Sequence, residues 1–342
     1  MAQNNLRSMS LAREDSPFAR PTDTSGMNNE GHPTNTLSEL DLELVKELEF
    51  NARQSIRDLA KKLGASHATV HRRFRRLVKT GMIEFAAVSD STALGFKISV
   101  LVGLDIRSGE AHTVANSLRH YPNVTFISLT TGRYDIMFYA VFRNQHEVLD
   151  FLDRKLSHIP GILTAEDMVV LELKKRSWMY LRGETVGYPE TTQRSIDQST
   201  LDLIKELELN PRESIANLAR KTRMSSISVT RKLQALLDDN ILKIVTVIDP
   251  FQFGFGVHTM ILVRAQLGAI NSVADILVTN TRIPKLLITT GPFNIAFWAM
   301  FQNLTEMSYF LTMEIGNIPG IIDYETLIQV EHLKRASQLG RL

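Results

Sequence analysis

Hydrophobic positions recur with helical spacing near the start of this 342-residue chain. Leu42, Val45 and Leu48 fall every three residues and predict a first helix. Ser55 and Asp58 have the spacing of a capping box, which predicts the start of a second helix. These two segments therefore predict a pair of short amphipathic helices.

A short turn and a third helix follow. Gly64 stands where a tight turn between helices requires a left-handed backbone, and Ser66 is suited to the N-cap of the next helix. That helix is expected to run to about Lys79 and to end at the C′ glycine Gly81. Three helices, the last two joined by a glycine turn, predict a winged-type helix-turn-helix.

Alternating patterns then replace the helical spacing. Strand-like segments occupy 97–106, 123–131, 133–142 and 161–173, and helical segments occupy 110–121 and 144–159. The order βαββαβ predicts a ferredoxin-like antiparallel sheet with two helices on one face. The bare face of such a sheet needs cover, most simply another copy of itself, so we expect assembly.

The whole pattern occurs twice. "LVKELEFNARQSIRDLAKK" at 44–62 returns as "LIKELELNPRESIANLARK" at 203–221, and "IPGI" at 159–162 returns at 318–321. The offset is 159 residues throughout, without insertion or deletion. The predicted fold class is therefore α+β, with two repeats, each a winged-type helix-turn-helix followed by a ferredoxin-like βαββαβ module.

The repeat and its flanks predict seven segments. These are an arm at 1–37, a helix-turn-helix domain at 38–92, a ferredoxin-like effector and dimerisation domain at 93–176, a linker at 177–198, a second helix-turn-helix at 199–251, a second ferredoxin-like domain at 252–335, and a tail at 336–342. The arm is rich in Asn, Ser, Thr, Pro and Gly, which predicts disorder. A role for the arm in touching DNA remains an alternative.

Composition narrows the class of protein. Hydrophobic residues make up 44% and charged residues 22% of the chain, as in soluble globular proteins. The absence of cysteine excludes disulfides and thiolate sites and favours a cytoplasmic location. No apolar run is long enough to span a membrane, and no cofactor is predicted. Because the net charge is only +2, any basic function must lie in a local patch.

Such a patch lies in "SHATVHRRFRRL" at 66–77. Val70, Phe74 and Leu77 share one helical face, and the arginines cover the opposite face, which a recognition helix presents to the major groove. Nine Lys/Arg against one Asp give the segment 53–79 a charge of +8. The alternative is a solvated amphipathic helix. The predicted contacts to double-stranded DNA are His67, Thr69, Arg72, Arg73 and Arg76.

His67 and His71 have a spacing that can ligate a metal, but no third ligand converges in sequence, so no metal site is predicted. The second copy is less basic, with six Lys/Arg against two acids over 212–238. Its predicted, weaker DNA contacts are Ser228, Arg231 and Lys232. The alternative for this copy is a degenerate domain kept for assembly.

The order of modules, with "TGRYDI" before the third strand and "IPGI" before the last, resembles the Lrp/AsnC (feast/famine) family of transcription regulators. The resemblance covers about 40–176 and 199–335. It implies a DNA-binding homo-oligomer, a dimer or higher, whose ferredoxin-like modules bind small effectors, often amino acids. The effector residues that it implies are Thr131, Gly132, Tyr134 and Asp135.

That loop has two interpretations. Glycine lets a ligand approach the backbone, and a carboxylate can receive an α-ammonium group. Alternatively, the glycine serves a tight turn that the aspartate caps. The second copy has Thr290, Gly291, Phe293 and Asn294 at these positions and lacks the carboxylate, so we expect the two sites to differ.

An enzyme is the rival class. Decarboxylases of sirohaem-type tetrapyrroles share the two-module fold and occur as fused pairs, and "GPFNIAFW" at 291–298 resembles their strand sequence. That resemblance implies histidine and arginine just before the strand, to hold and protonate the substrate. Here only Arg133 and Lys285 are cationic in those segments and no histidine is present, which favours a protein that is not an enzyme.

Overall fold

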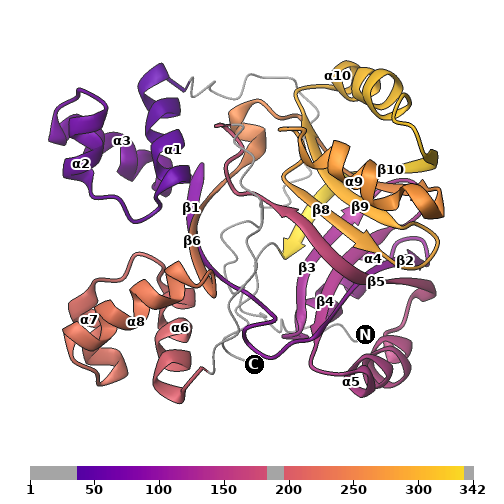
Figure 1. Ribbon diagram of the computed structural model, residues 1–342, viewed down its shortest axis with the longest axis horizontal. Coiled ribbons are helices and arrows are strands. Elements are labelled where there is room, and N and C mark those ends of the chain that lie inside the picture. Colours follow the sequence, from indigo (N-terminus) through magenta and orange to yellow (C-terminus); the bar gives the residue numbers. More distant parts are fainter. Residues whose placement is uncertain (1–36, 183–195, 335–342) are drawn as a thin grey trace, which may run out of the picture. The chain divides into compact units, whose positions relative to one another are not determined.

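The structure, a computed structural model, describes residues 37–182 and 196–334 (Figure 1). The predicted arm lies outside the described residues apart from Leu37, as do positions 183–195 of the linker and the whole tail. None of the described helices is long and apolar enough to cross a membrane.

Each repeat begins with three helices. They are α1 (Glu39–Phe50), α2 (Ile56–Lys62) and α3 (His67–Lys79), and then α6 (Gln198–Leu209), α7 (Ile215–Thr222) and α8 (Ser226–Asp238). Ser55 and Ser66 cap α2 and α3 as predicted, by accepting hydrogen bonds from backbone N–H groups. The left-handed turn at Gly64 is confirmed, with φ of +60°, and Arg223 adopts the same conformation in the second copy, with φ of +55°.

One strand follows each set of helices, and the two strands pair with each other. β1 (Ile83–Ser89) runs antiparallel to β6 (Leu242–Ile248), with Ala86 opposite Val245. These two residues are equivalent in the repeat, so a pseudo-twofold axis passes between them. Figure 1 shows β1 and β6 side by side. The sequence pattern carries no signal for this pairing.

The remaining eight strands form a closed barrel. They are β2 (Ile98–Ile106), β3 (Val124–Thr130), β4 (Ile136–Phe142), β5 (Ile162–Arg176), β7 (Val257–Ala265), β8 (Lys285–Thr289), β9 (Ile295–Phe301) and β10 (Ile321–Lys334). Each repeat contributes four antiparallel strands, in the orders β3-β4-β2-β5 and β8-β9-β7-β10. The pairs β5–β8 and β3–β10 join the two sets, so the modules pair within one chain.

Helices cover the outer face of each half. In the first repeat these are α4 (Ala111–Arg119), α5 (Gln145–Asp150) and the short helices η1 (Phe151–Lys155) and η2 (Leu156–His158); in the second they are η4 (Leu267–Ala269), α9 (Ile270–Val278), α10 (Leu304–Tyr309) and η5 (Phe310–Ile315). One more short helix, η3 (Pro250–Phe253), follows β6, and its Phe253 packs on the core of the first helix-turn-helix. Val114 of α4 and Phe151 of η1 pack with Phe138 on this face. The element order is thus βαββαβ in both repeats.

The inner faces of the two halves cover each other. Leu101 and Met137 of the first repeat share a buried cluster with Leu262 and Leu287 of the second. Alternate strand residues face the helices and the barrel interior, as the pleat requires. The cover that the bare sheet face needed is therefore supplied by the other half of the same chain.

Candidate nucleic-acid interface and effector loops

Helix α3 presents a basic face to solvent. Val70 and Leu77 are buried against α1 and α2, while His67, Arg72 and Arg75 are exposed. Thr69 is partly buried, and its hydroxyl lies 2.9 Å from the hydroxyl of the capping residue Ser66. The face that the sequence predicts for the DNA major groove is thus open on this helix.

Arg72 and Arg75 are free cations within the part of the chain that the structure describes. Neither guanidinium has an ion pair with a carboxylate there. An exposed, uncompensated guanidinium is available to a phosphate oxygen or a guanine edge. These two side chains are therefore the ones that α3 can offer to DNA without breaking an internal contact.

Arg73 and Arg76 have an internal partner. Nη1 of Arg73 lies 2.9 Å, and Nη2 of Arg76 lies 2.7 Å, from Oδ2 of Asp41 in α1. The Asp41 side chain is fully buried, and the hydroxyl of Ser38 also donates to it. Both arginines therefore tie α3 to α1, a contact that sequence periodicity did not reveal. Their predicted contact with DNA stays a prediction.

Electrostatics explains why Asp41 can stay charged. Burial raises the pKa of this carboxyl, but hydrogen bonds from Ser38 and Arg73, with the charge of Arg76, outweigh burial and hold the pKa below its ordinary value. The ionised carboxylate in turn keeps both guanidinium groups in place.

The second recognition helix is arranged differently. Arg231 of α8 is exposed, whereas Nζ of Lys232 binds the Asp197 carboxylate at 2.9 Å and Oγ1 of Thr200 at 2.7 Å. Ser228 is partly buried in the first turn of the helix. Of the three predicted contacts in this copy, Arg231 is thus the exposed cation, and it is the repeat equivalent of Arg72.

Two equivalent arginines connect the helix-turn-helix units. Arg53 donates to the carbonyls of Pro211 and Glu213 at 2.6 and 2.8 Å. Arg212 donates reciprocally to the carbonyls of Ala52 and, at 3.0 Å, Gln54. The sequence counts Arg53 in the basic segment, but its charge is directed at the other repeat rather than at solvent.

The predicted effector loop lies where the barrel closes. The amide of Thr131 donates to the carbonyl of Ile328 at 2.9 Å, and Gly132 has φ of +103°. A Cβ at Gly132 would lie 3.2 Å from the carbonyl oxygen of Thr326. The glycine is therefore needed both for its backbone angle and for its close approach to β10.

Asp135 acts as a cap in this structure. Its Oδ2 accepts the amide of Ile106 at 2.7 Å. In the second copy the amide group of Asn294 accepts from the Ala265 amide and donates to the Ala265 carbonyl, both at 2.8 Å. The turn-capping interpretation of this position thus has a structural basis in both copies. The proposed contact with an ammonium group remains a prediction.

Beside the loop, a small network of charged groups crosses from one repeat to the other. Arg133 binds Glu166 at 3.0 Å and Glu325 at 3.2 Å. The hydroxyl of the buried Tyr134 donates to Glu166, and this bond, with Arg133 beside it, lowers the pKa of that carboxyl. Sequence reasoning missed both glutamates, although their offset of 159 residues marks them as equivalent positions.

Arg133 and Lys285 are the two cations in the segments that the enzyme alternative concerns, and the structure describes the contacts of both. Arg133 is held by the glutamates just described. Nζ of Lys285 lies 4.3 Å from the ring centroids of Tyr139 and Trp298, a cation–π arrangement that differs from a polycarboxylate clamp. The two cations thus have structural partners of different kinds.

Comparison with known proteins gives the following matches. The Lrp/AsnC ligand binding domain matches residues 99–179, and a winged helix-turn-helix DNA-binding domain matches 37–84 and 196–243. The HTH-type transcriptional regulator FL11 of Pyrococcus horikoshii is 31% identical over 142 residues, which are 41% of this chain and 93% of that protein. Ptr1 of Methanocaldococcus jannaschii, another such regulator, is 29% identical over 140 residues, 41% of this chain and 95% of its own length.

A solved structure covers more of the chain. The crystal structure of the siroheme decarboxylase NirDL matches 88% of this chain and 96% of its own with a TM-score of 0.62, at 15% sequence identity. At that identity the likeness concerns the fold alone.

Two helix-turn-helix units and a ligand-binding domain define the class, a helix-turn-helix transcriptional regulator. The chain belongs to the Lrp/AsnC family of such regulators, and it carries the family's unit twice.

Proposed function

We propose that this protein is a sequence-specific transcription regulator that binds double-stranded DNA through α3 and α8. The observation that carries the proposal is the exposed pair Arg72 and Arg75, which have no ion-pair partner among the described residues. The neighbouring Arg73 and Arg76 hold the same helix in place through Asp41. The presented face therefore combines free charge with a fixed helix orientation, as a recognition helix needs.

The two recognition helices have unequal charge. α3 offers Arg72 and Arg75, whereas α8 offers Arg231 and has an exposed isoleucine, Ile227, in its first turn. Paired helix-turn-helix units bind half-sites about one helical turn of DNA apart or a multiple of that. Unequal units favour an asymmetric operator, with α3 on the half-site that binds more strongly.

The effector is a small molecule, with amino acids as the first class to test. The four predicted contacts, Thr131, Gly132, Tyr134 and Asp135, lie on a loop that touches β10 of the other repeat. A ligand at this loop would contact both halves and could change how they pair. We infer that 93–176 and 252–335 are two ferredoxin-like domains, and that assembly of chains into a homo-oligomer is a separate step.

DNA binding is best tested by a salt series. Wild type, Arg72→Ala, Arg231→Ala and the control Arg154→Ala, a highly exposed arginine of η1, would be titrated with genomic fragments. Each lost phosphate contact reduces the slope of log K against log salt by roughly 0.9. We expect a clear loss for Arg72→Ala, a smaller loss for Arg231→Ala and none for the control. Equal affinities for all four proteins would refute the proposal.

The fold likeness to NirDL makes decarboxylation the second candidate. It requires a tetrapyrrole carboxylate to bind near Arg133 or Lys285. Titration with an iron porphyrin that carries carboxylates, followed by its absorbance, distinguishes the two functions. A specific spectral change that Lys285→Ala abolishes would favour the enzyme, whereas no change leaves the regulator as the better account.

A further inference from the structure

The first turn of helix α8 carries an isoleucine that is exposed to solvent. The side chain of Ile227 is 83% exposed. It is absent from the apolar core of its helix-turn-helix, to which α8 contributes Val229, Leu233 and Leu236. A single exposed apolar side chain is common on protein surfaces and by itself indicates no site. Ile227, however, lies on a helix that is proposed to bind DNA, so the groups around it decide what it can contact.

The fold does not require isoleucine at this position. The repeat equivalent of Ile227 is Ala68, in the first turn of α3. Both helices have 13 residues and a serine N-cap, so alanine is sufficient for the same local structure. A β-branched side chain is less favourable than alanine in a helix, and an exposed isoleucine buries little apolar surface in return. Neither helix formation nor packing therefore explains the larger side chain.

Ile227 shares a helical face with an exposed cation. Arg231 follows it by four residues, so the two side chains lie one turn apart on the same side of α8. Arg231 is exposed and has no ion pair with a carboxylate among the described residues. Its guanidinium can bind a phosphate oxygen or a guanine edge. Because the first residues of a recognition helix contact base edges, such a contact would bring Ile227 against neighbouring base pairs.

Two other polar side chains near this face are engaged within the protein. The hydroxyl of Thr230 donates to a backbone carbonyl one turn earlier at 2.9 Å. Nε2 of Gln234 donates to Oδ1 of Asp238 at 2.7 Å. In the part of the chain that the structure describes, neither Ile227 nor Arg231 has an internal hydrogen bond or ion pair of this kind. The face thus offers one apolar side chain beside one available cation.

An apolar side chain in the major groove can distinguish thymine from the other bases. Thymine presents a C5-methyl group there, and apolar side chains contact that group. From this geometry we propose that Ile227 contacts the C5-methyl group of a thymine in the half-site bound by α8. The contact rests on the proposed DNA binding. It gives α8 a stronger preference for thymine at this position than α3 has, because Ala68 offers a smaller apolar surface.

Removal of the methyl group alone tests this contact. A duplex selected from a random-sequence library by the full-length protein would be synthesised with each thymine in turn replaced by deoxyuridine. This replacement keeps the base pair and removes only the C5-methyl group. We expect at least one replacement to weaken binding about fourfold, the effect of burying about one methyl group. Ile227→Ala should weaken binding to the thymine duplex by a similar factor and should be insensitive to that replacement.

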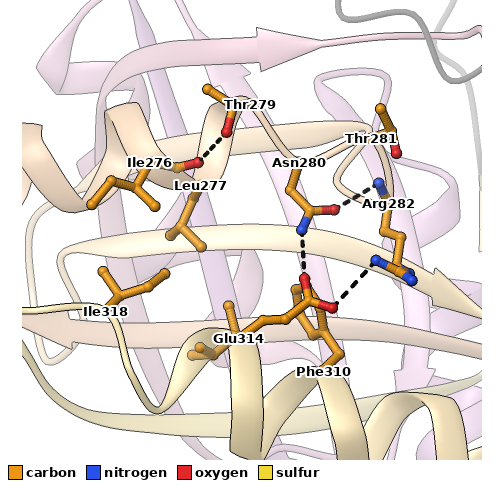
Figure 2. A pocket seen from close by; sticks show the side chains of 10 residues that line it. Ile276, Leu277, Thr279, Asn280, Thr281, Arg282, Phe310, Glu314 and Ile318 are labelled. Carbon is orange, nitrogen blue, oxygen red and sulfur yellow. Dashed lines mark hydrogen bonds and ion pairs between the residues drawn. The ribbon is translucent and has the colours of Figure 1, made fainter.

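A matched variant and a salt series separate this contact from other effects. Ile276 of α9 is also exposed, at 47%, and Figure 2 shows it at a surface hollow beside Leu277 and Ile318. Ile276→Ala should bind both duplexes as wild type does. Ile227→Ala should also keep the wild-type slope of log K against log salt, because an apolar contact displaces no counterions.

The results distinguish this contact from DNA binding itself. If no duplex is enriched and none binds, the proposed DNA binding and the contact are both overturned. If a duplex binds specifically but Ile227→Ala responds to every deoxyuridine replacement as wild type does, DNA binding stands and the contact is overturned. An unchanged thermal unfolding curve for Ile227→Ala would show that its weaker binding does not come from misfolding.

Discussion

Among single residues, Asp41 has the greatest influence on how the recognition helix α3 is held against α1. Its carboxylate is buried and receives hydrogen bonds from Ser38, Arg73 and Arg76. A charge buried among donors is favourable only while those donors remain, because its desolvation is otherwise uncompensated. Of four adjacent arginines in "RRFRR", two therefore serve the fold and two are exposed.

We predict that Arg73→Ala lowers the free energy of unfolding by about 1–2 kcal/mol, because it removes one charged partner of a buried carboxylate. The matched variant Arg72→Ala should change stability by less than about 0.5 kcal/mol, since its side chain is exposed. Urea unfolding of both variants, followed by circular dichroism, measures the difference. Equal stabilities would contradict the role assigned to Asp41.

Glu49 should make the free energy of unfolding depend on pH. Burial raises its pKa from the ordinary 4.5 to about 7, although the amides of Leu181 and Tyr180 donate to it. The folded protein therefore holds this proton more tightly than the unfolded chain does. The sign follows from linkage: stability falls as the pH rises through the window from about 4.5 to about 7.

The expected loss over this window is on the order of 2 kcal/mol. Glu49→Gln cannot titrate, so its unfolding free energy should lack this component. Chemical unfolding of both proteins between pH 5 and pH 8 gives the difference curve. A difference that does not vary with pH would show that Glu49 keeps its ordinary pKa.

At the scale of elements, the two helix-turn-helix units are joined by β1–β6 and by the reciprocal arginines. The Arg212 guanidinium also lies over the rings of Phe74 and Phe85, 5.0 and 4.7 Å from their centroids. It therefore contacts the buried side of α3 in the other repeat. This connection sets the relative position of the two recognition helices.

Arg212→Ala should destabilise the protein by about 1–3 kcal/mol, through lost charged hydrogen bonds and cation–π contacts. It should also make DNA binding more tolerant of base pairs inserted between the half-sites, since the units would be less firmly joined. Gel-shift assays on a series of spacer lengths test this. Arg220→Ala, an exposed arginine of α7, is the control, and the same tolerance in both variants would argue against the connection.

For the whole molecule, one chain reproduces the arrangement of a symmetric dimer. β5 pairs with β8 and β10 pairs with β3, at positions related by the repeat offset. Residues such as Met168 and Leu327 are fully buried between the halves. Each half alone would expose this apolar face.

A fragment of residues 37–182 should therefore form a homodimer, because its sheet face is self-complementary about the pseudo-twofold axis. Sedimentation equilibrium should give twice the fragment mass, while Met137→Glu at the buried face should give a monomer or an unfolded chain. A stable, monomeric wild-type fragment would show that the face does not need its counterpart.

The sequence alone was sufficient to predict the repeat, the helices and strands, and the left-handed turn at Gly64. These follow from spacing within short segments, which the backbone geometry of helices and strands imposes directly. The exposed face of α3 was likewise readable from the positions of Val70 and Leu77.

Only the tertiary structure showed which charged side chains have an ion-pair partner among the described residues and which do not. Asp41 reaches Arg73 across 32 residues, and Arg133 reaches Glu325 across 192. It also decided that β1 pairs with β6 and that the halves close a barrel within one chain. Periodicity describes the face on which a residue lies, whereas its partner depends on how distant segments meet.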